Sequence, residues 1–248
     1  MQKTISIVVA IFNRKDELFE LLNSLIAQTD KDFEVIIVDD GSFVDLLPTV
    51  ETFKEMLNIQ YFKKANSGPG LSRNYGANRA KNDWLVFVDS DVIVEKDYIE
   101  NIKKNLEKTD CAAFGGADKA HKGFNLLQKA ISYSMTSVFT TGGIRGSKKA
   151  VTRFQPRSFN MGVNKEIFLK IGGFSEMRIG EDPDLSMTIW ENGYQTAFFD
   201  DIGVYHKRRT DLGKFSKQVY QFGCARPILN QRHPDYVKPT FWFPTLFL

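Results

Sequence analysis

The stretch that decides the fold is Trp84-Leu85-Val86-Phe87-Val88-Asp89-Ser90-Asp91. Its five apolar residues are too few for a buried helix and predict a buried strand, which ends where the first carboxylate appears. Three further apolar runs, at 5–10, 33–38 and 59–62, predict strands as well. Because helix-like stretches separate these runs, we expect βαβ units and a mostly parallel, doubly wound α/β sheet.

Polar side chains collect where the predicted strands end. Asn13 and Arg14 follow the first strand, Asp39 and Asp40 follow the second, and Asp89 and Asp91 follow the fourth. Ligands of doubly wound sheets bind beyond the carboxyl ends of the strands. The sequence therefore predicts one site built from all three strand ends.

The composition is that of an ordinary globular protein. The 248 residues are 42% hydrophobic and 25% charged, and the net charge of only +3 argues against nucleic acid as the main partner. The two cysteines, Cys111 and Cys224, lack metal-ligand spacing, so we expect reduced thiols in a cytoplasmic protein. We find neither a signal-peptide pattern nor an apolar run long enough to span a membrane.

The rest of the chain is less regular. Helices are predicted over 49–57, 71–80, 181–191 and 212–230, and a strand is predicted over 195–199. The polar, glycine-rich stretch 140–157 predicts a mobile loop near the site. We divide the chain into a catalytic domain at 1–210 and a basic helix with an aromatic tail at 211–248.

The pair Asp89 and Asp91 is suited to metal chemistry. Two carboxylates at i and i+2 after a buried strand can hold Mg²⁺ or Mn²⁺ together with a diphosphate, because these cations take oxygen ligands. A solvated turn is the alternative for an isolated Asp-x-Asp, but the other acidic strand ends favour the metal. His206, which follows a strand-like segment, becomes a candidate third ligand.

Three other groups of polar residues are compatible with more than one interpretation. Asp39 and Asp40 suit either a hydrogen bond to a base or ribose, or a turn that caps the next helix. Arg73, in the first turn of a predicted helix, suits a phosphate oxygen or the plain protein surface. The three acids within 181–184 suit a helix N-terminus electrostatically, or supply a general base across the site.

Taken together, these residues resemble glycosyltransferase family 2, the inverting enzymes of the GT-A fold. The similarity covers roughly residues 4–210 and is specific in its order and spacing. The matching stretches are 6–14, 38–42, 73–77, 87–91, 159–164, 171–174 and 180–185. The resemblance implies a Rossmann-like, mostly parallel central sheet flanked by helices.

The resemblance also implies binding residues. The nucleotide of a nucleoside diphosphate sugar would be held by Ala10, Phe12, Arg14, Asp39, Asp40, Arg73, Asp89 and Ser90. A Mg²⁺ or Mn²⁺ ion would bind Asp91, with Asp89 and His206 as further ligands. The family uses UDP most often, which favours UDP as the nucleotide.

The implied reaction is a single displacement with inversion. Asp182 would take a proton from the acceptor hydroxyl, with Glu181 beside it at the sugar pocket and Asn160 near the donor sugar or acceptor. The Gln-x-x-Arg-Trp motif of processive synthases is absent. We therefore expect transfer of one sugar to a sugar or lipid-linked acceptor, in cell-surface polysaccharide or glycolipid assembly.

The end of the chain suggests a membrane surface. Residues 206–238 include eight Lys or Arg and two Asp, and 241–248 is strongly apolar. Such a face suits anionic head groups at the inner side of a membrane, whereas a solvated helix with a packed tail is the alternative.

Two other classes of function compete with sugar transfer. A nucleotidyltransferase that makes sugar nucleotides should carry a glycine-rich basic loop after the first strand, and residues 10–14 are not such a loop. A catalytically dead sugar-nucleotide-binding module is disfavoured by the joint presence of Asp89, Asp91 and Asp182.

Overall fold

The elements of the fold come from a computed structural model, which describes residues 3–119, 126, 129, 130, 133, 153–206 and 212–237. The strands are β1 (Ile5–Ile11), β2 (Phe33–Asp39), β3 (Ile59–Lys63), β4 (Trp84–Asp89), β5 (Val92–Val94), β6 (Ala113–Lys119), β7 (Asn160–Asn164) and β8 (Thr196–His206). The helices are α1 (Lys15–Ile26), α2 (Leu47–Glu51), α3 (Pro69–Ala77), α4 (Tyr98–Lys108), α7 (Lys165–Lys170), α8 (Glu181–Glu191), α9 (Leu212–Arg232) and the short 3₁₀ helix η1 (Pro234–Tyr236).

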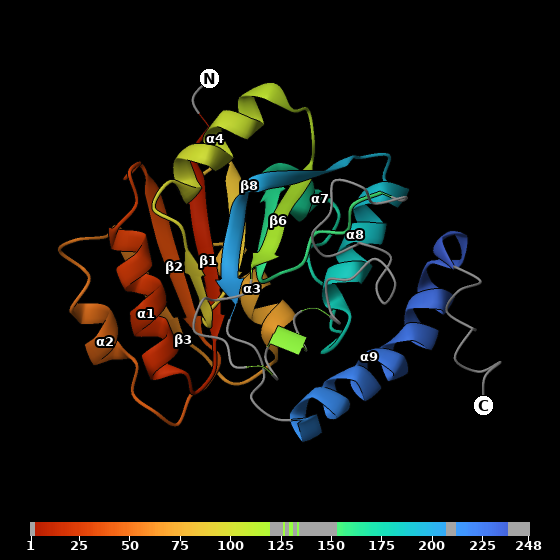
Figure 1. Cartoon of the computed structure of the whole chain (residues 1–248), viewed down its shortest axis with the longest axis horizontal. Coiled ribbons are helices and arrows are strands. Elements are labelled where there is room, and N and C mark those ends of the chain that lie inside the picture. Colours follow the sequence, from red (N-terminus) through yellow and green to blue (C-terminus); the bar gives the residue numbers. More distant parts are fainter. Residues whose placement is uncertain are drawn as a thin grey trace.

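One curled sheet occupies the middle of the molecule, in the order β3-β2-β1-β4-β7-β6-β8-β5 (Figure 1). The strands β3, β2, β1 and β4 are parallel to one another. In the other half, β7 is antiparallel to β4 and β6, β6 is parallel to β8, and β5 is antiparallel to β8. The predicted α/β fold is confirmed, and the antiparallel strands belong to the part that the sequence pattern did not resolve.

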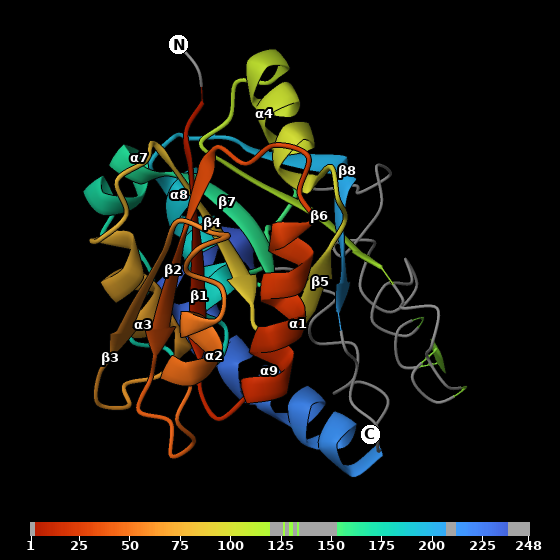
Figure 2. The same cartoon turned by 90° about the vertical axis from the view of Figure 1, so that its left-hand side faces the viewer.

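Helices cover both faces of the sheet (Figure 2). Alternate residues of a strand point to opposite faces, so Ile7 and Val9 join the core under α1, α2 and α4. Val8 joins the second core, which lies under α3, α7 and α8. Because both faces are buried, the central strands are apolar along nearly their whole length.

The curl of the sheet brings distant chain segments to the end of β4. Only Ser90 and Asp91 separate β4 from β5, and β5 pairs with β8 at the far edge of the strand order. In that pairing Val92 lies opposite His206. The last residue of β8 is therefore next to the acidic loop that follows β4.

The helix α9 packs beside α8. Its residues Ala225 and Leu229 are buried, and a Cβ atom on Gly180 would lie 3.3 Å from a side-chain carbon of each. Gly180 has the left-handed backbone conformation that glycine adopts without strain. Among the residues that the structure describes, no helix has the length and hydropathy that crossing a bilayer requires.

Several predicted boundaries were wrong. The expected helix at 49–57 ends as α2 at Glu51, because the chain continues in turns in which Phe53 and Met56 each donate to the carbonyl three residues earlier. The expected strand at 195–199 continues to His206 as one strand. The strands β5, β6 and β7 and the helices α4 and α7 were not predicted. Most of the predicted mobile loop, 140–152, and the apolar tail 241–248 lie outside the described residues.

Candidate active site

The ends of β1 and β4 meet where the strand order reverses, which is the usual ligand position in such sheets. Arg14, just after β1, forms an ion pair with Asp91, just after β4. Burial alone would lower the pKa of Arg14, but the charge and hydrogen bond of Asp91 raise it above its ordinary value. The register also places Ala10 beside Asp89. The structure thus brings together four of the predicted binding residues.

Arg73 connects the two sides of this site. The guanidinium, buried in the middle of α3 rather than in its first turn, donates to Asp89 through Nη2 at 2.8 Å and to Glu181 through Nη1 at 3.1 Å. The ring centroid of Phe174 lies 5.4 Å from the guanidinium carbon. Burial would lower the pKa of Arg73, but the charges of Asp89 and Glu181 raise it. The prediction left Arg73 open between surface and site, and its position is interior.

The acids at the start of α8 face Arg73 from the other side. Burial, together with the charge of Asp182, raises the pKa of Glu181 to about 8. Asp182 is more exposed than Glu181 and accepts a hydrogen bond from Ser158 Oγ at 3.2 Å. The two neighbouring carboxylates therefore differ in environment: Glu181 favours the protonated form, and Asp182 is the one that solvent reaches more readily.

Asp39 and Asp40 both organise the loops around the site. Asp40 accepts hydrogen bonds from Lys64 Nζ at 2.5 Å and from the backbone N–H groups of Ser67 and Gly68 at 2.9 and 2.8 Å. Burial would raise the pKa of Asp40, but these hydrogen bonds lower it below its ordinary value. Asp39 is fully buried and accepts a hydrogen bond from the Tyr61 hydroxyl at 2.7 Å. Loop organisation is observed for both residues, and their nucleotide contacts stay a prediction.

An exposed aromatic pair borders the ends of β1 and β2. The rings of Phe12 and Phe43 meet edge to face, with centroids 5.9 Å apart, and Phe43 is 89% exposed. Asn13, in the left-handed region at φ 55°, accepts the backbone N–H of Phe43 at 2.8 Å and donates its own N–H to Ser42 Oγ at 2.9 Å. The two loops are therefore tied together under two accessible rings.

The remaining predicted residues occupy different settings. Ser90 is buried in the loop between Asp89 and Asp91. The backbone of His206 lies opposite Val92, as described above, whereas its side chain lies outside the described residues.

Asn160 has an interior position. Its side-chain carbonyl accepts a hydrogen bond from the Tyr98 hydroxyl at 2.7 Å, and its amide nitrogen donates to the Ile202 carbonyl at 2.7 Å. The side chain is 1% exposed. These contacts join α4, β7 and β8 behind the site. The geometry gives no support to the predicted contact with donor sugar or acceptor, which stays a prediction.

The site therefore combines an acidic loop after β4, arginines from two other elements and a carboxylate pair on α8. A family model described as Glycosyl transferase family 2 matches residues 6–171, which is more than half of the chain. The chain belongs to glycosyl transferase family 2.

Proteins with similar sequences are named as glycosyltransferases. An uncharacterized glycosyltransferase of Haemophilus influenzae is 31% identical over 202 residues, which cover 78% of this chain and 64% of that protein. The poly(ribitol-phosphate) beta-N-acetylglucosaminyltransferase TarS of Staphylococcus aureus is 36% identical over 100 residues, which cover 39% of this chain and 18% of TarS. A Rickettsia felis glycosyltransferase matches 43% of this chain at 36% identity, and again 18% of its own length is covered.

Solved structures show the same fold. Residues 1–349 of S. aureus TarS, in complex with UDP-GlcNAc, superpose with a TM-score of 0.70 and 22% identity, covering 92% of this chain and 66% of that one. A mannosyltransferase of Pyrobaculum calidifontis, in complex with GDP-Man and Mn²⁺, gives a TM-score of 0.69 and 19% identity, covering 100% and 69%. The expected GT-A fold is thereby confirmed.

Sequence reasoning missed two residues beside the carboxylates of this family 2 site. Ser158 is the hydrogen-bond donor to Asp182, and Arg157 precedes it in the chain. Both come just before the 159–164 stretch that carries the family resemblance, which was the only available signal. An isolated Arg-Ser pair has no pattern of its own.

A second missed group lies between α8 and the end of α9. Arg232 Nε donates to Asp184 at 2.6 Å, and the buried ring of His233 lies between Asp184 and Glu191, at 3.0 and 2.7 Å. Asp184, one of the three acids of the family 2 stretch, is buried in this group rather than beside Arg73. Its position explains why α9 stays attached to α8.

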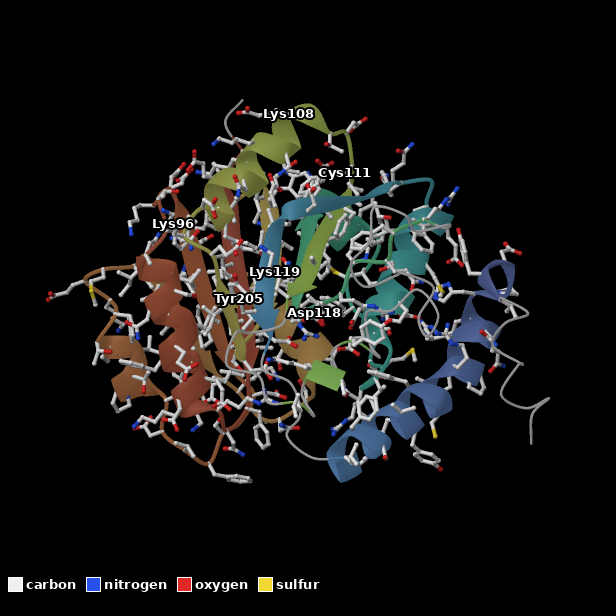
Figure 3. The ribbon with its side chains drawn as sticks, viewed as in Figure 1. Lys96, Lys108, Cys111, Asp118, Lys119 and Tyr205 are labelled. Carbon is white, nitrogen blue, oxygen red and sulfur yellow. The ribbon has the colours of Figure 1, made fainter. Side chains whose placement is uncertain are left out.

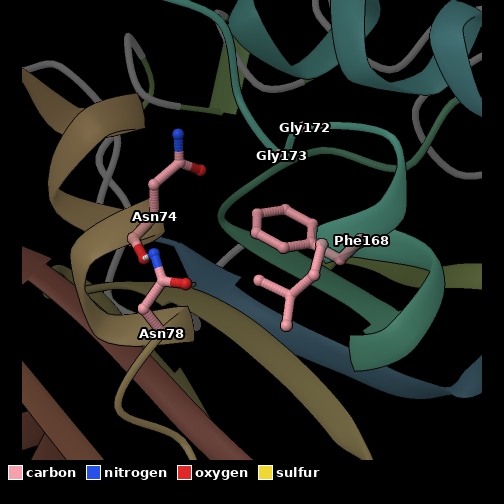
Figure 4. A pocket seen from close by; sticks show the side chains of 6 residues that line it. Asn74, Asn78, Phe168, Gly172 and Gly173 are labelled. Carbon is pink, nitrogen blue, oxygen red and sulfur yellow. Dashed lines mark hydrogen bonds between the residues drawn. The ribbon is translucent and has the colours of Figure 1, made fainter.

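A shallow hollow behind the site shows how α3 is held (Figure 4). It is lined by Asn74, Asn78, Phe168, Leu169, Gly172 and Gly173. The Asn74 side chain accepts the backbone N–H of Phe174 at 2.9 Å and donates to the carbonyl of the same residue at 2.7 Å. Consecutive residues of α3 therefore serve two purposes, since Arg73 points into the site while Asn74 fixes the turn behind it.

The far edge of the sheet carries a separate polar cluster. Glu95 accepts hydrogen bonds from Lys119 Nζ at 2.7 Å and from the Tyr205 hydroxyl at 2.9 Å, and Figure 3 shows Lys119 and Tyr205 side by side on β6 and β8.

At the end of α4, burial raises the pKa of the Cys111 thiol to about 12. Cys111 is a free thiol, as predicted, and so is Cys224, which is exposed.

Proposed function

We propose that this chain catalyses the transfer of a single sugar from a nucleoside diphosphate sugar, UDP-linked in the first instance, to an acceptor hydroxyl with inversion. The observation that carries the proposal is the Arg73 bridge between Asp89 and Glu181. It couples the predicted diphosphate side of the site to the carboxylate pair on α8. A nucleotide-binding module without chemistry would not need the second half of this bridge.

In this proposal Asp182 acts as the general base. It is the more exposed carboxylate of the pair and accepts a hydrogen bond from Ser158 Oγ. The raised pKa of Glu181 leaves that residue protonated at neutral pH, so the pair carries one charge rather than two. Asp182 then accepts the proton of the acceptor hydroxyl while that oxygen attacks the anomeric carbon.

We propose that the residues after β4 hold a divalent cation. Asp89 and Asp91, which flank Ser90 in the chain, offer carboxylate oxygens, and Mg²⁺ and Mn²⁺ prefer such oxygen donors. The backbone of His206 lies beside this loop. When bound, such an ion supplies positive charge to the leaving diphosphate. Arg14 and Arg73 contact the same two carboxylates and would orient the diphosphate from the protein side.

The acceptor in this proposal is a sugar or a lipid-linked sugar at the cytoplasmic face of a membrane. The helix α9 presents exposed apolar side chains, including Leu212, Tyr220, Phe222 and Ile228. Together with the basic residues of 206–238, these suit an anionic membrane surface. In flotation with vesicles containing phosphatidylserine, we expect the full chain to float and a chain lacking 239–248 to float less. Failure of both forms to float would contradict the membrane proposal.

The experiment that tests the proposed function is calorimetric titration with UDP, GDP and CDP, each with and without Mn²⁺. We expect one nucleotide to bind in a metal-dependent manner. Asp91→Ala should raise the Kd of that nucleotide by about tenfold or more, ~1.4 kcal/mol. The fold neighbours were solved with UDP-GlcNAc and GDP-Man, so both nucleotides belong in the comparison. Absence of nucleotide binding under every condition would contradict sugar transfer.

A further inference from the structure

The carboxylate of Asp182 is held at one of its two oxygens. Ser158 Oγ donates to Oδ1 at 3.2 Å, whereas none of the described residues donates a hydrogen bond to Oδ2. The main chain of Asp182 is fixed as well, because Ser186 Oγ, one turn further along α8, donates to its carbonyl at 2.9 Å. Asp182 as a whole is half-buried, and the oxygen without a donor still reaches solvent. One oxygen is therefore anchored and the other is open.

Ser158 takes its position from the sheet and not from α8. It lies in the tight turn that leads into β7, where the Asn160 N–H donates to the Arg157 carbonyl at 2.8 Å. The segment before this turn is tied to β8, since Thr196 Oγ1 donates to the Phe154 carbonyl at 2.5 Å. Ser158 is also buried. Its hydroxyl thus has a fixed place, from which it reaches across to the first turn of α8.

The orientation of this carboxylate matters for general-base chemistry. A base is effective when its proton-accepting oxygen lies within hydrogen-bond reach of the attacking group. The carboxylate of an aspartate rotates about the Cβ–Cγ bond with only a broad preference. A hydrogen bond to Oδ1 limits that rotation and directs Oδ2 away from the donor. The neighbouring Glu181 has a different anchor, because Arg73 donates to it at 3.1 Å.

We propose that Ser158 is a positioning residue for the base: it holds Oδ1 of Asp182, so that Oδ2 receives the proton of the attacking hydroxyl. This inference rests on the proposed function and adds a residue to it. As the hydroxyl oxygen bonds to the anomeric carbon, the bond from that carbon to the diphosphate breaks and the diphosphate leaves. The hydroxyl proton passes to Oδ2, while Ser158 keeps its own proton and acts only through Asp182.

The test measures hydrolysis of UDP-GlcNAc and of GDP-Man by the full chain with Mn²⁺, in which water takes the place of the acceptor. Release of the nucleoside diphosphate is the readout, and these donors are the ones bound in the fold neighbours. We expect Ser158→Ala to lower kcat about tenfold, while KM for the donor and the Kd of the nucleoside diphosphate stay within about twofold. Ser158→Thr, which keeps the hydroxyl, should retain most of the activity.

A double variant separates positioning from a general effect on the fold. In the Asp182→Asn background, Ser158→Ala should cause no further loss of kcat, because the oxygen that Ser158 positions no longer accepts the proton. An equal loss with and without the Asp182 carboxylate would overturn the proposal. An unchanged kcat in Ser158→Ala would overturn it too, and a rate for Ser158→Thr as low as that for Ser158→Ala would show that the hydroxyl is not what matters.

Ser6→Ala is the matched control. Ser6 is a buried serine near the start of β1, at the opposite end of the strand from the site, and it donates to the carboxylate of Glu34 at 2.6 Å. Its loss should lower stability in urea denaturation and leave kcat unchanged. Absence of both nucleotide binding and donor hydrolysis in the unmodified protein would contradict the proposed function and this inference with it. Hydrolysis that Asp182→Asn abolishes but Ser158→Ala leaves intact would contradict this inference alone.

Discussion

The two sides of the candidate site differ in how their acidic and basic side chains are arranged. On the side of β1 to β4, the basic and acidic groups are paired, as in Arg14 with Asp91 and Lys64 with Asp40. On the α8 side, Glu181 lies next to a second carboxylate, and Nε of Arg157 has no acceptor among the described residues. The first side is organised by pairs of opposite charge, whereas the second places two carboxylates of different exposure next to each other.

The largest expected effect is the loss of activity that follows removal of the proposed base on the α8 side. Asp182→Asn keeps the size of the side chain and the contact with Ser158 but cannot accept the proton. We expect kcat to fall by a factor of about 100 to 10,000, while the Kd of the nucleotide stays within about twofold. Radiolabelled sugar transfer measures the first and calorimetry the second. Unchanged transfer by Asp182→Asn would show that the base is elsewhere.

A smaller effect, on the pH dependence of stability, is expected from neutralising Glu181, the buried carboxylate of the pair on α8. The pKa of Glu181 in the folded protein, about 8, lies above its ordinary value of 4.5, so the folded state binds more protons between these values. The contribution of Glu181 to stability is therefore present below about pH 4.5 and is lost as the pH rises through 8.

Glu181→Gln removes this dependence. Its stability relative to the unmodified protein should increase by on the order of 4 kcal/mol between pH 5 and pH 9, as measured by urea denaturation. Glu176→Gln, at an exposed glutamate, is the matched control and should give the same difference at both pH values. A flat difference for Glu181→Gln as well would mean that Arg73 keeps Glu181 charged throughout this range.

The smallest expected effect is on nucleotide affinity, and it comes from the exposed rings at the ends of β1 and β2. Phe43→Ala removes an 89% exposed ring and its edge contact with Phe12. If the pair borders the base of the nucleotide, the Kd should rise about threefold, ~0.7 kcal/mol, with stability unchanged. Phe19→Ala serves as the comparison, because Phe19 is a half-exposed ring that lies away from the site, in α1 beside Phe53. Equal nucleotide affinity in both variants would remove Phe43 from the binding surface.

The sequence predicted best where each element carries its own signal. The strands β1, β2 and β4 are continuous apolar runs, and α8 spans Glu181–Glu191, as predicted. In contrast, β6 contains Gly115-Gly116 and β7 contains only five residues around Gly162. Neither has a strand pattern of its own, because pairing with neighbouring strands determines their conformation.

The same division holds within the site. The acidic loop after β4 could be predicted because a buried strand precedes it, and Asp182 could be predicted because the family motif includes it. The interior bridge of Arg73 to Glu181 joins residues 108 positions apart, so no local pattern could have revealed it. Ser158 could not be predicted either, since its significance comes from what surrounds it in space.

The group formed by Asp184, Glu191, Arg232 and His233 has a practical consequence for handling this protein. It fastens the last turn of α9 to the helix that carries Asp182. A chain shortened at residue 210, where sequence alone suggested a boundary, would leave the buried carboxylate of Asp184 without Arg232 and His233 and uncover the surface under Ala225 and Leu229. Expression trials for crystallisation should therefore keep at least residues 1–237, even where only nucleotide binding is of interest.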